Sequence, residues 1–444
     1  MTFPPGPALP ESEQLRLMRT APIDFIESCH RDFGSIFTLQ LGRFGNTEVT
    51  ETNNGKWVIV TKPDDVKTLF KADPDRVLAG AANKILFGGK TQTGGIIRLD
   101  GRAHAEIRRV YQPIFTGASM KAYIPAIIAA AERQAKAWSR TRPFPLLPEL
   151  QRITIRVIAH SILGFPREEL EILCPRLMCL EDAAIKGQQR VMVERELSRI
   201  VTDHIERYAG ADMSHRVDVF ARLTQVQKSD GRRLSAKELH DELITLLKAG
   251  FGTTSNALAW LFGCILRDPA IYIQVVSELE RVTQGAAVAR DHVERLTYLD
   301  AVIKEMLRLC PSIGGFTGVR YLADPLELGG YPLPAGTMVA VATHVLHRDP
   351  DVYEDPLVFR PERFLEHKVS IYSWAPFGGG NRMCVGKSFA IQEMKVVVAT
   401  LLTRLEMRLD QPIGKPEVQG FFCAPSGRGP LVRVRDRIAG LTRG

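Results

Sequence analysis

The sequence predicts a mainly α-helical protein with a small β-rich part. Apolar residues recur at helical spacing through most of Met120–Glu242, and again in Glu242–Leu266 and Tyr298–Pro311. Short runs typical of strands occur near the start of the chain, between residues 326 and 342, and near its end. The helical stretches are much longer than the strand-like runs, so the pattern favours a mainly helical chain with a smaller β-rich part.

Composition is that of a globular chain in a reducing compartment. The 444 residues carry a formal charge of +8 and seven cysteines, an odd number with no CxxC pair, which argues against a disulfide framework. The basic balance fits an acidic protein partner, an anionic membrane, nucleic acid or simply a solvated surface. Met1–Pro10 is proline-rich and shows neither a signal peptide nor a spanning helix, so we expect a cytoplasmic protein without a membrane anchor.

The first hundred residues alternate between helix and strand. Glu11–Phe33 reads as helix, Ile36–Leu41 and Trp57–Thr61 as strands joined across an Asn53-Asn54-Gly55 turn, and Pro63–Lys71 as a short helix. Val77–Ile97 reads as irregular, with glycines between apolar residues. Such a loop either lines a ligand pocket, through residues such as Phe87, Ile96 and Ile97, or is a mobile surface loop.

Two helices carry candidate functional residues at helical spacing. Asp100–Phe115 places His104 and Arg108 one turn apart, which on its own indicates an ordinary solvated pair. Glu242–Leu266 has no charge after Phe251, so it is either a buried core helix or a membrane span. Lys248 inside it favours the core helix, as do six small or polar residues: Gly250, Gly252, Thr253, Thr254, Ser255 and Asn256. The Gly and Thr residues among them also suggest a local break in the helix.

The last third of the chain contains a further helix and several short strands. Tyr298–Pro311 predicts a helix in which Glu305 and Arg308 share a face; an exposed pair of this kind stabilises little. His344 and His347 form a weak metal motif, and we expect both to be structural. The remaining elements are strands at Leu326–Leu328, Tyr331–Leu333 and Met338–Ala342, and a hairpin at Val418–Val434.

The stretch most suggestive of chemistry is Phe377–Gly386, where Cys384 ends a glycine-rich loop just before a helical pattern. The positive end of a helix favours a thiolate, and glycines allow close approach to a flat, bulky group. The loop lacks the Lys-Ser/Thr of a phosphate-binding P-loop. A lone buried cysteine acting only as a small hydrophobe is the simpler alternative.

Four motifs together resemble those of the cytochrome P450 family. Phe377, Gly380, Arg382, Cys384 and Gly386 match its Cys-ligand loop, and Ala249–Thr254 is similar to its oxygen-binding segment. His104 with Arg108 matches its propionate-binding helix, and Glu305 with Arg308 matches its Glu-x-x-Arg helix, with Arg363 in the accompanying Pro-x-Arg-Phe segment. These motifs occur in family order along nearly the whole chain.

The resemblance implies a single cytochrome P450 domain over residues 1–444, with 1–75 and 312–345 in the β-rich lobe. It implies haem b between the central helix and the loop, with Cys384 as the axial thiolate. Arg320 would join His104, Arg108, Phe377, Gly378, Arg382 and Gly386 in cofactor binding, and Glu305, Arg308 and Arg363 would lock the Cys-ligand loop. Gly250, Thr253 and Thr254 would serve oxygen activation, beside a pocket that includes Phe87, Ile96, Ile97, Ala249, Ile313, Phe316, Phe421 and Phe422.

The implied activity is the hydroxylation, or another oxidation, of an apolar small molecule by activated dioxygen. A separate ferredoxin-type donor and its reductase would supply electrons, docking near Arg102, Arg109 and Lys387; no nucleic-acid partner is expected. One position departs from the family pattern, because Gly252 stands where an acid normally precedes the threonine. Three consequences are open: water or another side chain replaces the acid, oxygen activation is slow and leaky, or the protein is a haem-thiolate isomerase, dehydratase or peroxide-driven enzyme. A haem-containing binding protein without turnover is a separate alternative.

Overall fold

The computed structural model describes residues 3–42, 55–87, 94–179, 187–419 and 422–437. Its α-helices are α1 Glu11–Thr20, α2 Pro22–Phe33, α3 Pro63–Lys71, α4 Ala79–Phe87, α5 Gly101–Tyr111, α6 Gly117–Lys136, α7 Leu146–Ser161, α8 Arg167–Met178, α9 Gly187–Arg207, α10 Val219–Gln225, α11 Ala236–Arg267, α12 Pro269–Thr283, α13 Arg290–Val293, α14 Thr297–Leu309, α15 Thr343–Leu346, α16 Arg363–Glu366 and α17 Lys387–Arg404. Two 3₁₀ turns that matter below are η3 Ile96–Arg98 and η4 Gly380–Arg382.

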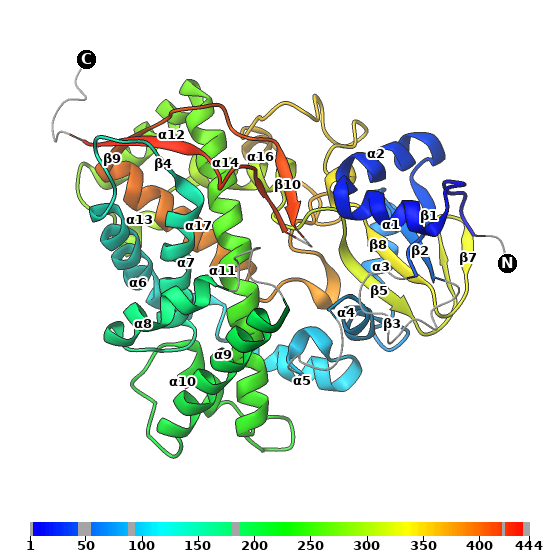
Figure 1. Cartoon of the computed structure of the whole chain (residues 1–444), viewed down its shortest axis with the longest axis horizontal. Helices are drawn as coiled ribbons and strands as arrows, with labels where there is room; N and C mark the ends of the chain where they lie inside the picture. Colours follow the sequence, from blue (N-terminus) through cyan, green and yellow to red (C-terminus); the bar gives the residue numbers. More distant parts are fainter. Residues whose placement is uncertain (1–2, 43–54, 88–93, 180–186, 420–421, 438–444) are drawn as a thin grey trace.

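The strands are short and fall into four sheets. They are β1 Ile36–Gln40, β2 Lys56–Val60, β3 Val77–Leu78, β4 Phe144–Pro145, β5 Thr317–Leu322, β6 Leu326–Leu328, β7 Tyr331–Leu333, β8 Met338–Val341, β9 Leu405–Leu409, β10 Pro416–Gln419, β11 Phe422–Pro425 and β12 Leu431–Asp436. The largest sheet has the order β1-β2-β8-β5-β3, and only its β2–β8 pair is parallel. This sheet and helices α1–α4 form the small lobe, on the right of Figure 1.

Helix α11 is the centre of the large lobe (Figure 1). A capping box begins it, because the Ser235 hydroxyl accepts from the Glu238 amide while the Glu238 carboxylate accepts from the Ser235 amide. Its 32 residues are long and apolar enough to cross a membrane, but 72% of its most apolar window is buried inside the protein. The prediction of a core helix is thus favoured over the membrane span.

The expected local break in α11 is wrong. The helix is continuous, and the Thr253 and Thr254 hydroxyls donate to the carbonyls of Ala249 and Gly250 at 2.8 and 2.9 Å. These side-chain bonds add to the backbone ladder of the helix instead of replacing it.

Three further expectations about elements need correction. Val77–Ile97 is not wholly irregular, since it contains α4. Glu11–Phe33 is two helices, with Pro22 at the first position of the second. The predicted Val418–Val434 hairpin is divided, because β10 pairs with β11 while β12 pairs with β9 and β4. Asn53 and Asn54 of the predicted turn lie outside the described residues.

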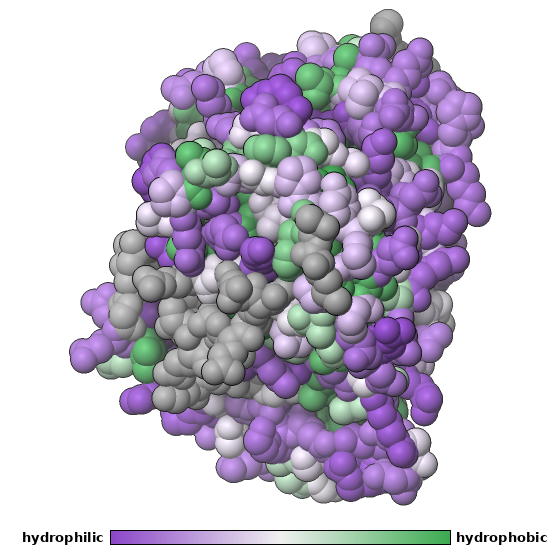
Figure 2. Space-filling view, turned by 90° about the vertical axis from the view of Figure 1, so that its right-hand side faces the viewer, coloured by the Kyte–Doolittle hydropathy of each residue, from purple (hydrophilic) through white to green (hydrophobic). Residues whose placement is uncertain are grey.

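The face of the small lobe seen in Figure 2 is mainly polar, with apolar side chains in small separate groups. Inside this lobe Trp57 and Phe316 pack with ring centroids 5.9 Å apart. Phe316, expected in the substrate pocket, is 5% exposed and belongs to this lobe's core. Its apolar character is explained by packing between the sheet and α4.

Candidate haem-thiolate site

The Cys384 loop is held in shape by backbone hydrogen bonds. The Cys384 amide donates to the Phe377 carbonyl at 2.9 Å, and the Met383 amide donates to the Gly380 carbonyl at 3.2 Å. Arg108 of α5 donates to the Met383 carbonyl, which ties the loop to the helix with the predicted His-x-x-x-Arg pair. The loop therefore presents Cys384 from a fixed backbone just before α17 begins at Lys387.

Cys384 is an exposed residue, yet protein atoms lie close enough to its sulfur for burial to affect the thiol. Burial raises the pKa of this thiol, while backbone N–H groups of Gly386 and Lys387 and the positive charge of Arg108 act in the opposite direction. Those donors stabilise a negative charge on the sulfur. A metal cation that displaces the proton would therefore leave a negative charge on the sulfur that these donors partly stabilise.

The glycines of the loop serve a neighbouring side chain. A Cβ on Gly379 would come within 2.2 Å of the Phe70 ring, and one on Gly380 within 2.1 Å of the Phe70 carbonyl oxygen. Gly378 has a φ of +66°, close to the +64° of Gly380, but it differs in having no atom within 4 Å of an added Cβ. Close approach at Gly379 and Gly380 thus accommodates α3, a partner that the sequence did not reveal.

Buried positive charge gathers beside the loop. Burial lowers the pKa of Arg320 to about 10 and also lowers the pKa values of Arg108 and Arg382. His104 is 5% exposed, and burial together with Arg382 lowers its pKa to about 4, so it is neutral at pH 7 and can donate one ring N–H.

Asp100 contributes one negative charge against these three guanidinium groups. It pairs with Arg382, and it raises the pKa of Arg320, opposing burial. An excess of buried positive charge is costly unless anions offset it. Two propionate carboxylates would do so, and the residues present therefore fit haem.

The middle of α11 has a short exposed stretch within a mostly buried helix. Ala249 is exposed and Thr253, one turn later, is partly exposed, whereas Thr254 is 4% exposed. A Cβ on Gly250 would lie 2.7 Å from Cδ1 of Ile158 on α7. Thr253 is therefore the accessible member of the threonine pair, and Gly250 lets α7 pack closely.

Glu305, Arg308 and Arg363 are brought together in a fully buried network. Arg308 donates to the two Glu305 oxygens at 2.7 and 2.8 Å, and Arg363 donates to one of them at 3.1 Å. The remaining Arg308 donors reach the carbonyls of His347, Pro356 and Val358. His347 itself bonds the Arg308 carbonyl and the Ala375 amide, which leads into the Cys384 loop.

The remaining pocket residues are only partly placed. Ile96 is 5% and Ile97 39% exposed in η3, and Ile313 is partly exposed. Phe87 ends α4 and Phe422 begins β11. Phe421 lies outside the described residues. Gly314 sits against Val418 and Cys423, so the segment after α14 packs on the β10–β11 hairpin.

Asp100 is a site residue that sequence reasoning missed. Its position directly before α5 indicates an N-cap, but it makes no side-chain bond to that helix. Its carboxylate instead accepts from the Gly80 and Ala81 amides, both at 2.7 Å, and from Arg382. One carboxylate thus joins the start of α4 to the Cys384 loop.

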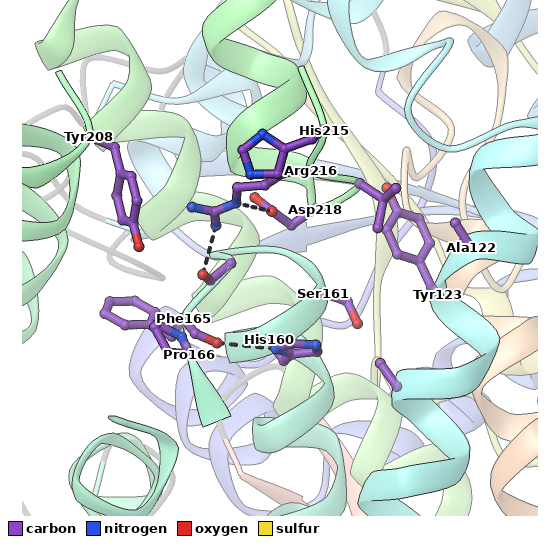
Figure 3. A pocket seen from close by; sticks show the side chains of 13 residues that line it. Ala122, Tyr123, His160, Ser161, Phe165, Pro166, Tyr208, His215, Arg216 and Asp218 are labelled. Carbon is purple, nitrogen blue, oxygen red and sulfur yellow. Dashed lines mark hydrogen bonds and ion pairs between the residues drawn. The ribbon is translucent and has the colours of Figure 1, made fainter. Parts of the chain in front are cut away.

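A separate cavity of about 410 Å³ lies between α6, the end of α7 and the loop after α9 (Figure 3). Arg216 spans one wall, donating to Asp218 and the Gly164 carbonyl, both at 2.7 Å, with its guanidinium 4.7 Å from the Tyr208 ring centroid. Its charge is thus already paired, and none of the four motifs contributes to this cavity.

Comparisons with known proteins identify the family of this chain. The cytochrome P450 family profile matches residues 186–428. Cytochrome P450 135B1 of Mycobacterium tuberculosis and Mycobacterium bovis is 31% identical over 98% of this chain and 92% of its own length. Its name gives the family but no substrate. Cytochrome P450 135A1 of M. tuberculosis is 30% identical over 99% of this chain and 96% of its own length.

Solved structures show the same fold. A cyanobacterial P450, CYP120A1 with bound retinoic acid, has a TM-score of 0.82 at 22% identity, covering 98% of this chain and 100% of its own. The haem domain of cytochrome P450DA has a TM-score of 0.83 at 22% identity and covers 98% and 97%. The predicted fold class, mainly α with a small β lobe, is confirmed. The chain belongs to the cytochrome P450 family, whose members bind haem b through a cysteine thiolate and activate dioxygen.

Proposed function

We propose that this protein is a haem-thiolate monooxygenase that oxidises an apolar small molecule with electrons from a separate redox partner. The observation that carries the proposal is the Cys384 sulfur, which faces the Gly386 and Lys387 amides and Arg108 in a loop fixed from both sides. When bound there, haem supplies reductive activation of dioxygen and insertion of one oxygen atom into the substrate.

Each group of residues has a separate task in this proposal. Cys384 would bind the iron as a thiolate, and Arg320, Arg382, Arg108 and His104 would bind the propionates. The small Ala249 side chain would leave space for a ligand, and Thr253 would move a proton. The apolar side chains of Ile96, Ile97 and Ile313 bind the substrate and exclude water, which favours an apolar guest.

The test uses the haem-loaded protein. The reduced protein treated with carbon monoxide should show the red-shifted absorption band of thiolate ligation, and turnover with electrons and isotopically labelled dioxygen should place one labelled atom in the product. Because Gly252 removes the usual acid, the main rival is an isomerase, dehydratase or peroxide-driven enzyme. Turnover without reductant, or product free of label from dioxygen, would favour that rival.

Thr253→Ala is expected to lower product formed per electron consumed by about tenfold or more, because proton transfer by a placed side chain contributes at least that much. The Thr253 hydroxyl now donates to the Ala249 carbonyl at 2.8 Å, and its oxygen can still accept a hydrogen bond. Product and released peroxide, measured against electrons consumed, check this. Thr253→Ser should restore coupling; equal coupling in the Ala and Ser variants would contradict a relay through the hydroxyl.

An acidic iron–sulfur donor is expected to bind severalfold more weakly in Arg102→Glu/Arg109→Glu protein and as salt is raised. Both arginines lie exposed on α5, whereas Lys387 is half-buried near the Trp374 ring and offers less charge to a partner. Arg199→Glu on α9 is the matched control. The apparent affinity is measured by donor titrations. If it changes neither with salt nor with the α5 substitutions, electrostatic docking is contradicted.

A further inference from the structure

One buried carboxylate of α11 has no part in the mechanism above. Glu242 is 2% exposed and lies seven residues before Ala249, so both are on the same face of the helix. Its Oε2 accepts from the Tyr111 hydroxyl of α5 at 2.7 Å and from the Ile96 amide at 3.2 Å. A single oxygen atom therefore joins three separate segments of the chain.

Residues 94–100 run from α11 to the Cys384 loop. At one end Gly95 packs so tightly on α11 that an added Cβ would lie 2.1 Å from the Thr245 hydroxyl. At the other end Arg382 donates to the Leu99 carbonyl and to Asp100. In between, the Ile97 carbonyl accepts from Asn83 at 2.7 Å. The segment thus bridges the two sides of the site, and it carries Ile96 and Ile97.

We propose that Glu242 is a positioning residue that latches residues 94–98 onto α11 and α5 and thereby limits access to the site between α11 and Cys384. The latch rests on the proposed function only for the identity of that site. It deepens that function by assigning control of entry to a residue outside the family motifs.

The latch responds to protons. Burial raises the pKa of Glu242 from 4.5 to about 7, although the Tyr111 hydroxyl and the Ile96 amide oppose the shift. In an opened arrangement water solvates the carboxyl, which returns to its ordinary pKa. The closed form is therefore most stable below pH 4.5. As the pH rises from 4.5 to about 7, the equilibrium constant for opening increases about tenfold per pH unit, and above about 7 it stays constant.

The titratable groups around Glu242 come from α5, α11 and η3. Tyr111 faces it from α5, and Asp241 and Glu238 on α11 raise its pKa further. Asp241 is paired with Lys237 at 2.6 Å, and Glu238 with Lys228 and Arg232. On η3, Arg98 is buried, and burial lowers its pKa.

Amide hydrogen exchange in the haem-loaded protein between pH 5 and 8 tests the latch directly. After correction for intrinsic exchange, protection of the Ile96 amide should fall about tenfold per pH unit up to about pH 7 and then level off. Glu242→Gln keeps the acceptor but cannot ionise, so its protection should not change with pH. Glu206→Gln, on an exposed carboxylate of α9, should behave like the unmodified protein.

Two further measurements distinguish a latch from ordinary packing. Tyr111→Phe removes a donor that favours the ionised form, so its plateau should begin at higher pH. Carbon monoxide recombination after flash photolysis of the reduced protein, which needs neither substrate nor turnover, should speed up with pH in the unmodified protein and stay constant in Glu242→Gln. The proposal would be overturned if the Ile96 amide showed the same pH trend in the unmodified and Glu242→Gln proteins. It would also be overturned if the recombination rate did not change with pH in parallel with amide exchange.

Discussion

Replacing Cys384 with alanine is expected to abolish the red-shifted band of the reduced, carbon-monoxide-treated protein and to reduce oxygenation to undetectable levels. The Gly386 and Lys387 amides and Arg108 favour negative charge on this sulfur, against the burial that raises its pKa. Alanine removes the only ligand that these groups prepare. Absorption spectra of the haem-loaded variant and product analysis with an electron donor measure both losses.

A matched cysteine variant separates ligation from general damage. Cys179→Ala changes a half-buried thiol at the end of α8, and should keep both the band and activity. The Cys384 variant should also fold, because the Phe377 and Gly380 carbonyl bonds that shape the loop come from its backbone. If the Cys384 variant keeps the shifted band, another residue binds the iron and the assignment is wrong.

The sequence identified site residues whose partners are close in the chain or whose motif occupies one short segment. Glu305 and Arg308 are three residues apart on one helix, and the Cys384 motif occupies one loop. Helical and strand periodicity likewise located most elements, because side-chain burial follows the period of each structure. For such motifs, an expected role could therefore be assigned to each residue from the sequence alone.

Residues that the sequence did not identify act through contacts between distant segments. Asp100 looks like a helix cap, but it binds amides of α4 some twenty residues earlier. Phe70 explains two glycines of a loop that follows it by more than 300 residues. Glu242 joins α11 to α5 and η3. No local pattern encodes such pairings, because tertiary packing decides them.

Glu305→Ala is expected to cost about 3–5 kcal/mol of folding free energy, the range for breaking a buried ion pair by removing one partner. Glu305 accepts two bonds from Arg308, one from Arg363 and one from the Arg360 amide at 2.8 Å. Without it, two guanidinium groups that are at most 5% exposed lose their shared anion. Urea unfolding of the haem-loaded protein measures the loss.

The control is an ion pair of similar length on the surface. Lys121 Nζ lies 2.7 Å from Glu294 Oε1, and both side chains are exposed. Glu294→Ala should therefore cost no more than about 1 kcal/mol of folding free energy. Comparable losses in the two variants would show that the buried network contributes no more than a surface pair.

The network should also affect the cofactor site, at a distance. Arg308 holds the carbonyls of His347, Pro356 and Val358, and His347 accepts from the Ala375 amide at 2.9 Å, nine residues before Cys384. Losing Glu305 frees Arg308 to move, and with it the support of the Cys384 loop. The haem content of purified Glu305→Ala protein should therefore fall together with its stability. Full haem content in a destabilised variant would mean that the network supports the fold without positioning the loop.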